Sequence, residues 1–152
     1  MATALAVLVP GLILVASPAQ AYVLCQSTTA KTLSSSWEPY SQRFGGKTYT
    51  LNRTVAEGKV DSRNTNHFCG ALRAGATGTV ETGGSVATLR AILFSETSAT
   101  LATNSTTVNP GGTATVYTGW YGVQCGYANS NLAVPPFGTL ITGAALVCGP
   151  AG

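Results

Sequence analysis

The sequence predicts an all-β fold, namely a disulfide-stapled antiparallel β-sandwich or jelly-roll-like domain with about six to eight short strands. Segments with alternating apolar and polar residues are separated by glycine-rich turns, which is the pattern of half-buried strands. The composition is 45% hydrophobic and only 9% charged, which indicates a folded domain rather than a disordered chain. Four cysteines complete the argument, because small secreted domains are often held together by disulfides.

The N-terminal residues 1–21 have the layout of a secretory signal peptide. An apolar run over residues 4–16 is followed by the Ala-Gln-Ala motif at 19–21, a small-residue cleavage site. The run is shorter than the roughly 20 residues that a membrane-spanning helix needs, so no stable membrane span is expected. The sequence therefore predicts a secreted, extracellular protein whose single mature domain is residues 22–152 and begins at Tyr22.

The first third of the domain is predicted to contain one clear strand. Residues 22–26 form a short β-like run, and residues 27–36 are rich enough in Ser and Thr to form a loop or one poor helical turn. After the Gly45-Gly46 turn, apolar and polar residues alternate over residues 47–55, as in a half-buried strand. One face is expected to carry Tyr49, Leu51 and Val55, and the other Thr48, Thr50, Asn52 and Thr54.

The middle third is predicted to contain three strands. Residues 57–66 are polar and are expected to be a connection, and residues 67–73 and 77–82 are two short strands separated by Gly75. After a Gly-Gly turn, residues 86–95 form the strongest strand of the chain. Its core candidates are Leu89, Ile92, Leu93 and Phe94.

The last third begins with a turn at residues 109–112, Asn-Pro-Gly-Gly. Proline presets the backbone at the second turn position, and glycine takes the positive φ that follows. Residues 113–123 are predicted to be a long strand and residues 129–136 a loop. Residues 138–148 form the last strand, which is apolar on both faces and is therefore expected in the centre of a sheet.

The cysteines are expected to form two disulfides. Four cysteines allow three pairings, and shorter loops are easier to close, which favours Cys25–Cys69 and Cys125–Cys148. A zinc site is disfavoured because no Cys-x-x-Cys pair is present and His67 is the only histidine. The sequence predicts no metal site and no cofactor.

Groups suited to catalysis are scarce. A Ser-His-Asp triad would have to use His67 and the only aspartate, Asp61, and a surface histidine is the favoured interpretation. A glycosidase needs two carboxylates about 5–10 Å apart, and of the five acidic residues only Glu38 has aromatic neighbours, Trp37 and Tyr40. The sequence predicts no catalytic residue, and an enzyme is less favoured than a binding or structural protein.

The charged residues occupy only part of the chain, because all of them lie between Lys31 and Glu96 and residues 97–152 have none. The basic residues are spread singly, so nucleic acid is not an expected partner. Threonine, serine and asparagine that simply cover a solvent face are one explanation of the charge-free segment. A contact surface is the other, because interfaces and stacking surfaces use exposed aromatic rings. The candidate binding residues are Tyr117, Tyr121 and Tyr127.

Strand parity divides the residues of the segment 113–123 between two faces. The small apolar residues and the tryptophan are expected to face the core, whereas Tyr117 and Tyr121 lie together on the outer face, roughly 13 Å apart. The predicted inner set is Ala114, Val116, Thr118 and Trp120.

Two classes of function remain. The first is a non-catalytic extracellular domain that binds a neutral glycan, a cell-wall polymer or a protein, including as an inhibitor. The alternative is a structural subunit that self-assembles through its charge-free C-terminal half, and a small secreted hydrolase is a distant third. Asn52 and Asn104 each begin an Asn-x-Thr triplet, the pattern of an N-glycosylation acceptor.

Overall fold

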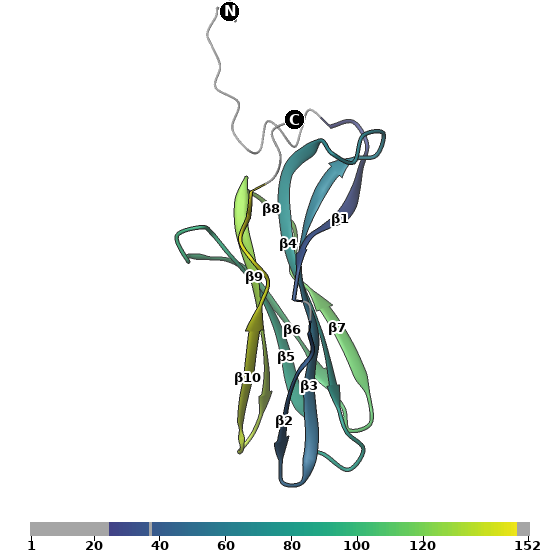
Figure 1. Cartoon of the computed structure of the whole chain (residues 1–152), viewed down its shortest axis with the longest axis vertical. Helices are drawn as coiled ribbons and strands as arrows, with labels where there is room; N and C mark the ends of the chain where they lie inside the picture. Colours follow the sequence, from purple (N-terminus) through teal and green to yellow (C-terminus); the bar gives the residue numbers. More distant parts are fainter. Residues whose placement is uncertain (1–24, 37, 149–152) are drawn as a thin grey trace, which may run out of the picture.

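The computed structural model describes residues 25–36 and 38–148, and it shows an all-β sandwich of two antiparallel sheets (Figure 1). Eleven strands are present in these residues, more than the number expected from the sequence. The predicted disulfides Cys25–Cys69 and Cys125–Cys148 are both confirmed. The predicted signal peptide and Trp37 lie outside the described residues.

Sheet A contains the strands from the N-terminal half of the domain together with two short strands that come later. Four of its strands run in the order β1-β3-β4-β7, while β2 pairs with β3 and β8 pairs with β4. The strands are β1 (Thr28–Ser35), β2 (Tyr40–Phe44), β3 (Lys47–Asp61), β4 (Phe68–Val80), β7 (Thr113–Tyr117) and β8 (Tyr121–Gly122).

Sheet B contains most of the charge-free C-terminal segment. Its strands run in the order β10-β9-β5-β6, and β11 pairs with β9. The strands are β5 (Ala87–Phe94), β6 (Thr100–Val108), β9 (Cys125–Val134), β10 (Gly138–Gly143) and β11 (Val147–Cys148).

The core lies between the inner faces of the two sheets, where apolar residues alternate with outward-facing polar ones. Strand β9 shows the alternation most regularly, since every second residue from Gly126 to Val134 is buried. One hydroxyl pair lies within this core, with Thr54 Oγ1 of β3 2.6 Å from Ser130 Oγ of β9. The largest fully buried side chains are those of Tyr49, Leu51, Leu72, Leu89, Leu93, Leu132 and Leu140.

The N-terminal strands are longer than the sequence suggested. The predicted loop or helical turn at 27–36 is wrong, because Thr28–Ser35 forms β1 and pairs with the second half of β3. That half includes residues 57–61, which were expected to be a connection. Polar serine and threonine residues suit an edge strand such as β1, where one side of the strand faces water.

A register shift in β3 changes which of its side chains face the core. The pairing with β4 shifts between Leu51 and Arg53, so the residues after this irregularity point the opposite way from the regular alternation. Tyr49 and Leu51 face inward as predicted. The predicted grouping of Val55 with them is wrong, because Thr54 takes the inward position beside Ser130.

Strand β4 is a single strand through Gly75, whereas two short strands were predicted. Strand β5 confirms the strongest predicted strand, with Leu89 and Leu93 in the core. The other two core candidates, Ile92 and Phe94, are only half-buried because they have the opposite parity.

The C-terminal half departs most from the sequence-based expectation. The predicted loop at 129–136 is wrong, because residues 129–134 belong to β9, which lies between β10 and β5. The predicted central strand at 138–148 is instead β10 at the edge of sheet B, followed by the short β11. The turn at 109–112 is confirmed, since Gly112 N–H donates to Asn109 O and Gly111 has a φ of 79°.

Candidate functional site

Strands β3, β4 and β7 are neighbours in sheet A (Figure 1). A group of aromatic and cationic side chains lies on the outer face of these strands. The guanidinium carbon of Arg73 lies 4.1 Å from the ring centroid of Tyr117 and 4.6 Å from that of Trp120. Lys59 Nζ lies 5.2 Å from the Trp120 ring. We refer to Arg73, Tyr117, Trp120, Lys59 and Glu57 as the aromatic–cation cluster.

The register between β4 and β7 places Tyr117 in this cluster. Tyr117 lies directly opposite Gly75, and its ring covers the space that a side chain at Gly75 would occupy. A Cβ atom at that position would lie only 2.5 Å from Tyr117 Cε1. Cross-strand contact of an aromatic ring with a glycine compensates for the missing side chain, which explains why β4 continues through Gly75.

An ion pair with Glu57 holds the guanidinium group of Arg73 against the rings of Tyr117 and Trp120. Arg73 of β4 lies opposite Glu57 of β3. Glu57 Oε1 accepts a hydrogen bond from Arg73 Nε at 2.9 Å, and Arg73 Nη2 lies 2.8 Å from the same oxygen in an ion pair. Both side chains are largely covered, so the pair is less screened by solvent than an exposed one. Each cation–aromatic contact adds about 0.5–2 kcal/mol depending on its desolvation, and together they fix the orientation of the rings.

A row of hydroxyl groups continues from the cluster along the same face. Thr77 Oγ1 lies 2.9 Å from Thr115 Oγ1, and Thr79 Oγ1 lies 2.8 Å from Thr113 Oγ1. Each hydroxyl has one donor and two acceptor sites, so these pairs keep capacity for further hydrogen bonds. A shallow hollow of about 70 Å³ lies between the row and the cluster, and its lining includes Thr77, Thr115 and Tyr117.

The three tyrosines predicted to bind a ligand do not lie together. Strand β7 ends at Tyr117, and β8 resumes with its register shifted by one residue, so Tyr121 lies opposite Leu72 of β4. Directly opposite residues of an antiparallel pair share a face, so Tyr121 points to the core side of the sheet, as Leu72 does. Its side chain is nevertheless 42% exposed. The predicted shared face of Tyr117 and Tyr121 is therefore wrong.

Tyr127 lies on the other sheet. In β9 it has outward parity, its ring stacks on Phe94 with centroids 5.1 Å apart, and its hydroxyl donates to Ser98 Oγ at 2.8 Å. Of the predicted tyrosines, only Tyr117 belongs to the aromatic–cation cluster.

The predicted core position of Trp120 is also wrong. The residue follows the end of β7, outside the alternation that held for Ala114, Val116 and Thr118, and it is half-buried against Arg73. Sequence reasoning missed Glu57, Lys59 and Arg73, because only the pairing of β3 with β4 brings them beside residues 117–120. Only Arg73 lay in a predicted strand, so its parity was a signal, whereas Glu57 and Lys59 fell in a segment expected to be a connection.

Asn104 supports the cluster from the neighbouring sheet. Its Nδ2 atom donates to the backbone oxygen of Tyr117 at 2.9 Å, at the point where β7 ends. The other predicted glycosylation asparagine, Asn52, accepts a hydrogen bond from Thr79 Oγ1 at 2.7 Å on the face that carries the hydroxyl row.

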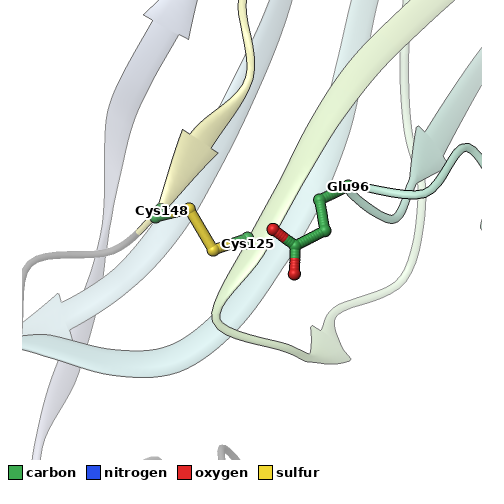
Figure 2. Close-up of side chains that lie close together, drawn as sticks. All are labelled: Glu96, Cys125 and Cys148. Atoms are coloured by element: carbon green, nitrogen blue, oxygen red, sulfur yellow. A yellow bond between two sulfur atoms is a disulfide. The ribbon is translucent and has the colours of Figure 1, made fainter.

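A second group of potential ligand atoms lies beside the C-terminal disulfide. Within the described residues, the Glu96 carboxylate and the sulfur atoms of Cys125 and Cys148 lie within 4.8 Å of one another (Figure 2). Both sulfur atoms belong to the disulfide, so neither is a thiolate, the form of cysteine that binds metals. The arrangement offers a metal a single carboxylate.

Asp61 and His67, the sequence candidates for a triad, lie at the two ends of the turn between β3 and β4. Asp61 Oδ1 accepts a hydrogen bond from the Arg63 backbone N–H at 2.8 Å, and Asp61 N–H donates to the backbone oxygen of His67. These bonds give the aspartate a structural role in the turn.

Comparison with known proteins provides no relative for this chain, since no family model, no curated protein and no solved structure matches it. Among the described residues, no helix is long and apolar enough to cross a membrane. The two disulfides are typical of extracellular proteins.

Proposed function

We propose that this protein is a secreted, non-catalytic domain that binds a neutral glycan on the outer face of sheet A. The observation that carries the proposal is the position of Tyr117 and Trp120, whose rings are held by Arg73 directly beside a row of threonine hydroxyls. Aromatic rings stack on the apolar faces of sugars, while the hydroxyl groups of threonine bond to sugar hydroxyls. Both kinds of group lie on one sheet face here.

The ion pair between Arg73 and Glu57 favours a neutral ligand. Glu57 neutralises Arg73 at 2.8 Å, so the guanidinium is committed within the protein and serves mainly to position the rings. Binding dominated by stacking and neutral hydrogen bonds depends little on ionic strength, in contrast to binding of a polyanion.

The proposal is tested with a glycan array and then with affinity electrophoresis on a soluble neutral polysaccharide that the array selects. Tyr117→Ala and Trp120→Ala are each expected to weaken binding about tenfold, because one lost stacking contact is worth about 1–1.5 kcal/mol. Tyr127→Ala removes a similar ring from the other sheet and is the matched control, with unchanged binding. Selection of anionic glycans alone, or equal loss in all three variants, would refute the proposal.

The predicted export of the protein has its own test. Cleavage after Ala21 should yield secreted material that lacks residues 1–21 and begins at Tyr22, as measured by intact mass spectrometry. Secreted protein that retains Met1 would contradict this prediction without affecting the glycan proposal.

A further inference from the structure

We propose that two copies of this chain associate by antiparallel pairing of their β10 strands, which joins two sheets B into one continuous sheet. Among the described residues, β10 pairs only with β9, so its other side presents unpaired backbone N–H and C=O groups. Such an edge is a template for another strand.

Sheet A leaves the second half of this edge open, although Phe44 of β2 stacks on Phe137 next to its beginning, with ring centroids 5.9 Å apart. An open groove of about 540 Å³ separates the end of β1 from the end of β10, with Leu33 to Ser36 and Glu38 on one side and Thr142 and Gly143 on the other. A strand from another molecule therefore has access to the backbone of β10 from its C-terminal end.

The other edges of the sandwich carry features that discourage pairing. The edge strands β1 and β2 of sheet A contain Lys31 and Arg43, and charged side chains on an edge oppose strand addition. At the opposite side of the sandwich, β6 contacts β7 of the other sheet, and Asn104 of β6 donates to the backbone of Tyr117. Strand β10 contains no charged residue and no proline.

Exposed apolar side chains gather along the same edge. Ile141 in the middle of β10 is 62% exposed, the highest value among the large apolar side chains of the described residues. Phe137 just before the strand and Leu146 three residues after it are also exposed, although one side of the Phe137 ring stacks on Phe44 of β2. Three of the seven exposed large apolar side chains thus lie on or beside one short strand, where a partner would cover them.

The distribution of charge favours a second copy of the chain as the partner. Sheet A and its turns carry the whole net charge of +3, because Arg90 and Glu96, the only charged residues after Glu81, cancel. Copies that meet edge to edge through sheet B keep their basic sheets apart, and the charge-free β10 strands do not repel each other.

The alternation of faces limits the register of the pair. Directly opposite residues must share a face, so pairing about a two-fold axis at Ile141 brings the two Ile141 side chains together on the outer face. Leu140 of one copy then lies opposite Thr142 of the other, and both face inward. This inference does not depend on the proposed glycan site, which lies on the other sheet.

The first experiment is a measurement of mass in solution by light scattering and sedimentation over a wide concentration range. The native protein should form a concentration-dependent dimer, and Ile141→Lys should raise its dissociation constant by more than about tenfold, because two like charges would lie side by side. Val86→Lys, at an apolar residue that is 54% exposed and outside β10, is the control and should dimerise normally. A native protein that stays monomeric, or an Ile141→Lys variant that dimerises normally, overturns the proposal.

The second experiment tests the register by cross-linking. Opposite Cβ atoms in an antiparallel pair are about 4.5–5.5 Å apart, so Ile141→Cys should give a disulfide-linked dimer on mild oxidation, while Val86→Cys should not. Equal cross-linking of both variants, or polymers larger than dimers, would place the contact elsewhere and overturn the two-fold β10 pair. Circular dichroism spectra that match the native protein show that each variant is folded.

Discussion

The hydroxyl groups of Thr54 and Ser130 satisfy each other inside the core, where no water competes for them. A buried hydroxyl that loses its partner carries its full desolvation cost, about 1–3 kcal/mol. Thr54→Val and Ser130→Ala are each expected to destabilise the domain by that amount. The double variant should cost clearly less than the sum, since it leaves no unpaired group. Urea unfolding of the four proteins measures this, and strict additivity would contradict the role assigned to the pair.

Gly75 is the residue on which the position of the Tyr117 ring depends. Gly75→Ala would place a methyl group within 2.5 Å of Tyr117 Cε1, so the ring must move away from its place beside Arg73. We expect a destabilisation of about 1–3 kcal/mol, typical of overpacking, and weaker binding of the neutral glycan. Gly119→Ala is the control, because a Cβ atom there meets nothing within 4 Å. Thermal unfolding and affinity electrophoresis provide the measurements, and unchanged binding by Gly75→Ala would argue against the assigned ring position.

At the scale of elements, Glu81 joins the start of β3 to the end of β4. Its Oε1 atom accepts the Thr48 backbone N–H at 2.7 Å, and the Glu81 N–H donates to Thr48 O at 3.0 Å. The hydrogen bond from Thr48, assisted by the nearby charges of Lys47 and Arg43, lowers the pKa of the Glu81 carboxyl group.

A lowered pKa predicts a definite sign for the pH dependence of stability. The stabilisation by ionised Glu81 is present above the pKa of the unfolded chain and is lost as the pH falls through the lowered folded value. Glu81→Gln should therefore lower the unfolding temperature at neutral pH, and the difference from the native protein should shrink below about pH 4. Thermal unfolding across this range tests the sign, and a difference that does not change with pH would contradict it.

At the scale of the whole molecule, each disulfide closes a long loop within its own part of the chain. Cys25–Cys69 spans 44 residues and ties the beginning of the described chain to β4, while Cys125–Cys148 spans 23 residues and ties β9 to β11. Loop entropy predicts losses of about 4 and about 3.5 kcal/mol when the cysteines of each pair are replaced by alanine. Denaturant unfolding of the two double variants measures these losses. A loss of stability below about 1 kcal/mol would indicate that the unfolded chain without the disulfide already keeps the ends of the loop close together.

The sequence by itself determined the class of fold, because that class depends on local patterns. Glycine and proline marked the turns at 45–46, 83–84 and 109–112, the alternation of Ala87–Phe94 marked its strand, and loop length selected the disulfide pairing that the structure shows. Each of these features is a property of residues close in the chain or of their spacing. No partner strand had to be known in advance.

The tertiary structure alone decided which residues share a face and which strands lie at an edge. A shift of one residue in pairing turns every later side chain to the other face. One such shift turns Thr54 into the core, and another places Tyr121 on the opposite face from Tyr117. Strand β10 was predicted to be central because its segment is apolar on both faces, yet among the described residues it pairs with a strand on one side only. Arg73 joins Tyr117 and Trp120 only through the register of β4 with its neighbours. Pairing between distant segments sets these features, and no local pattern in the chain encodes it.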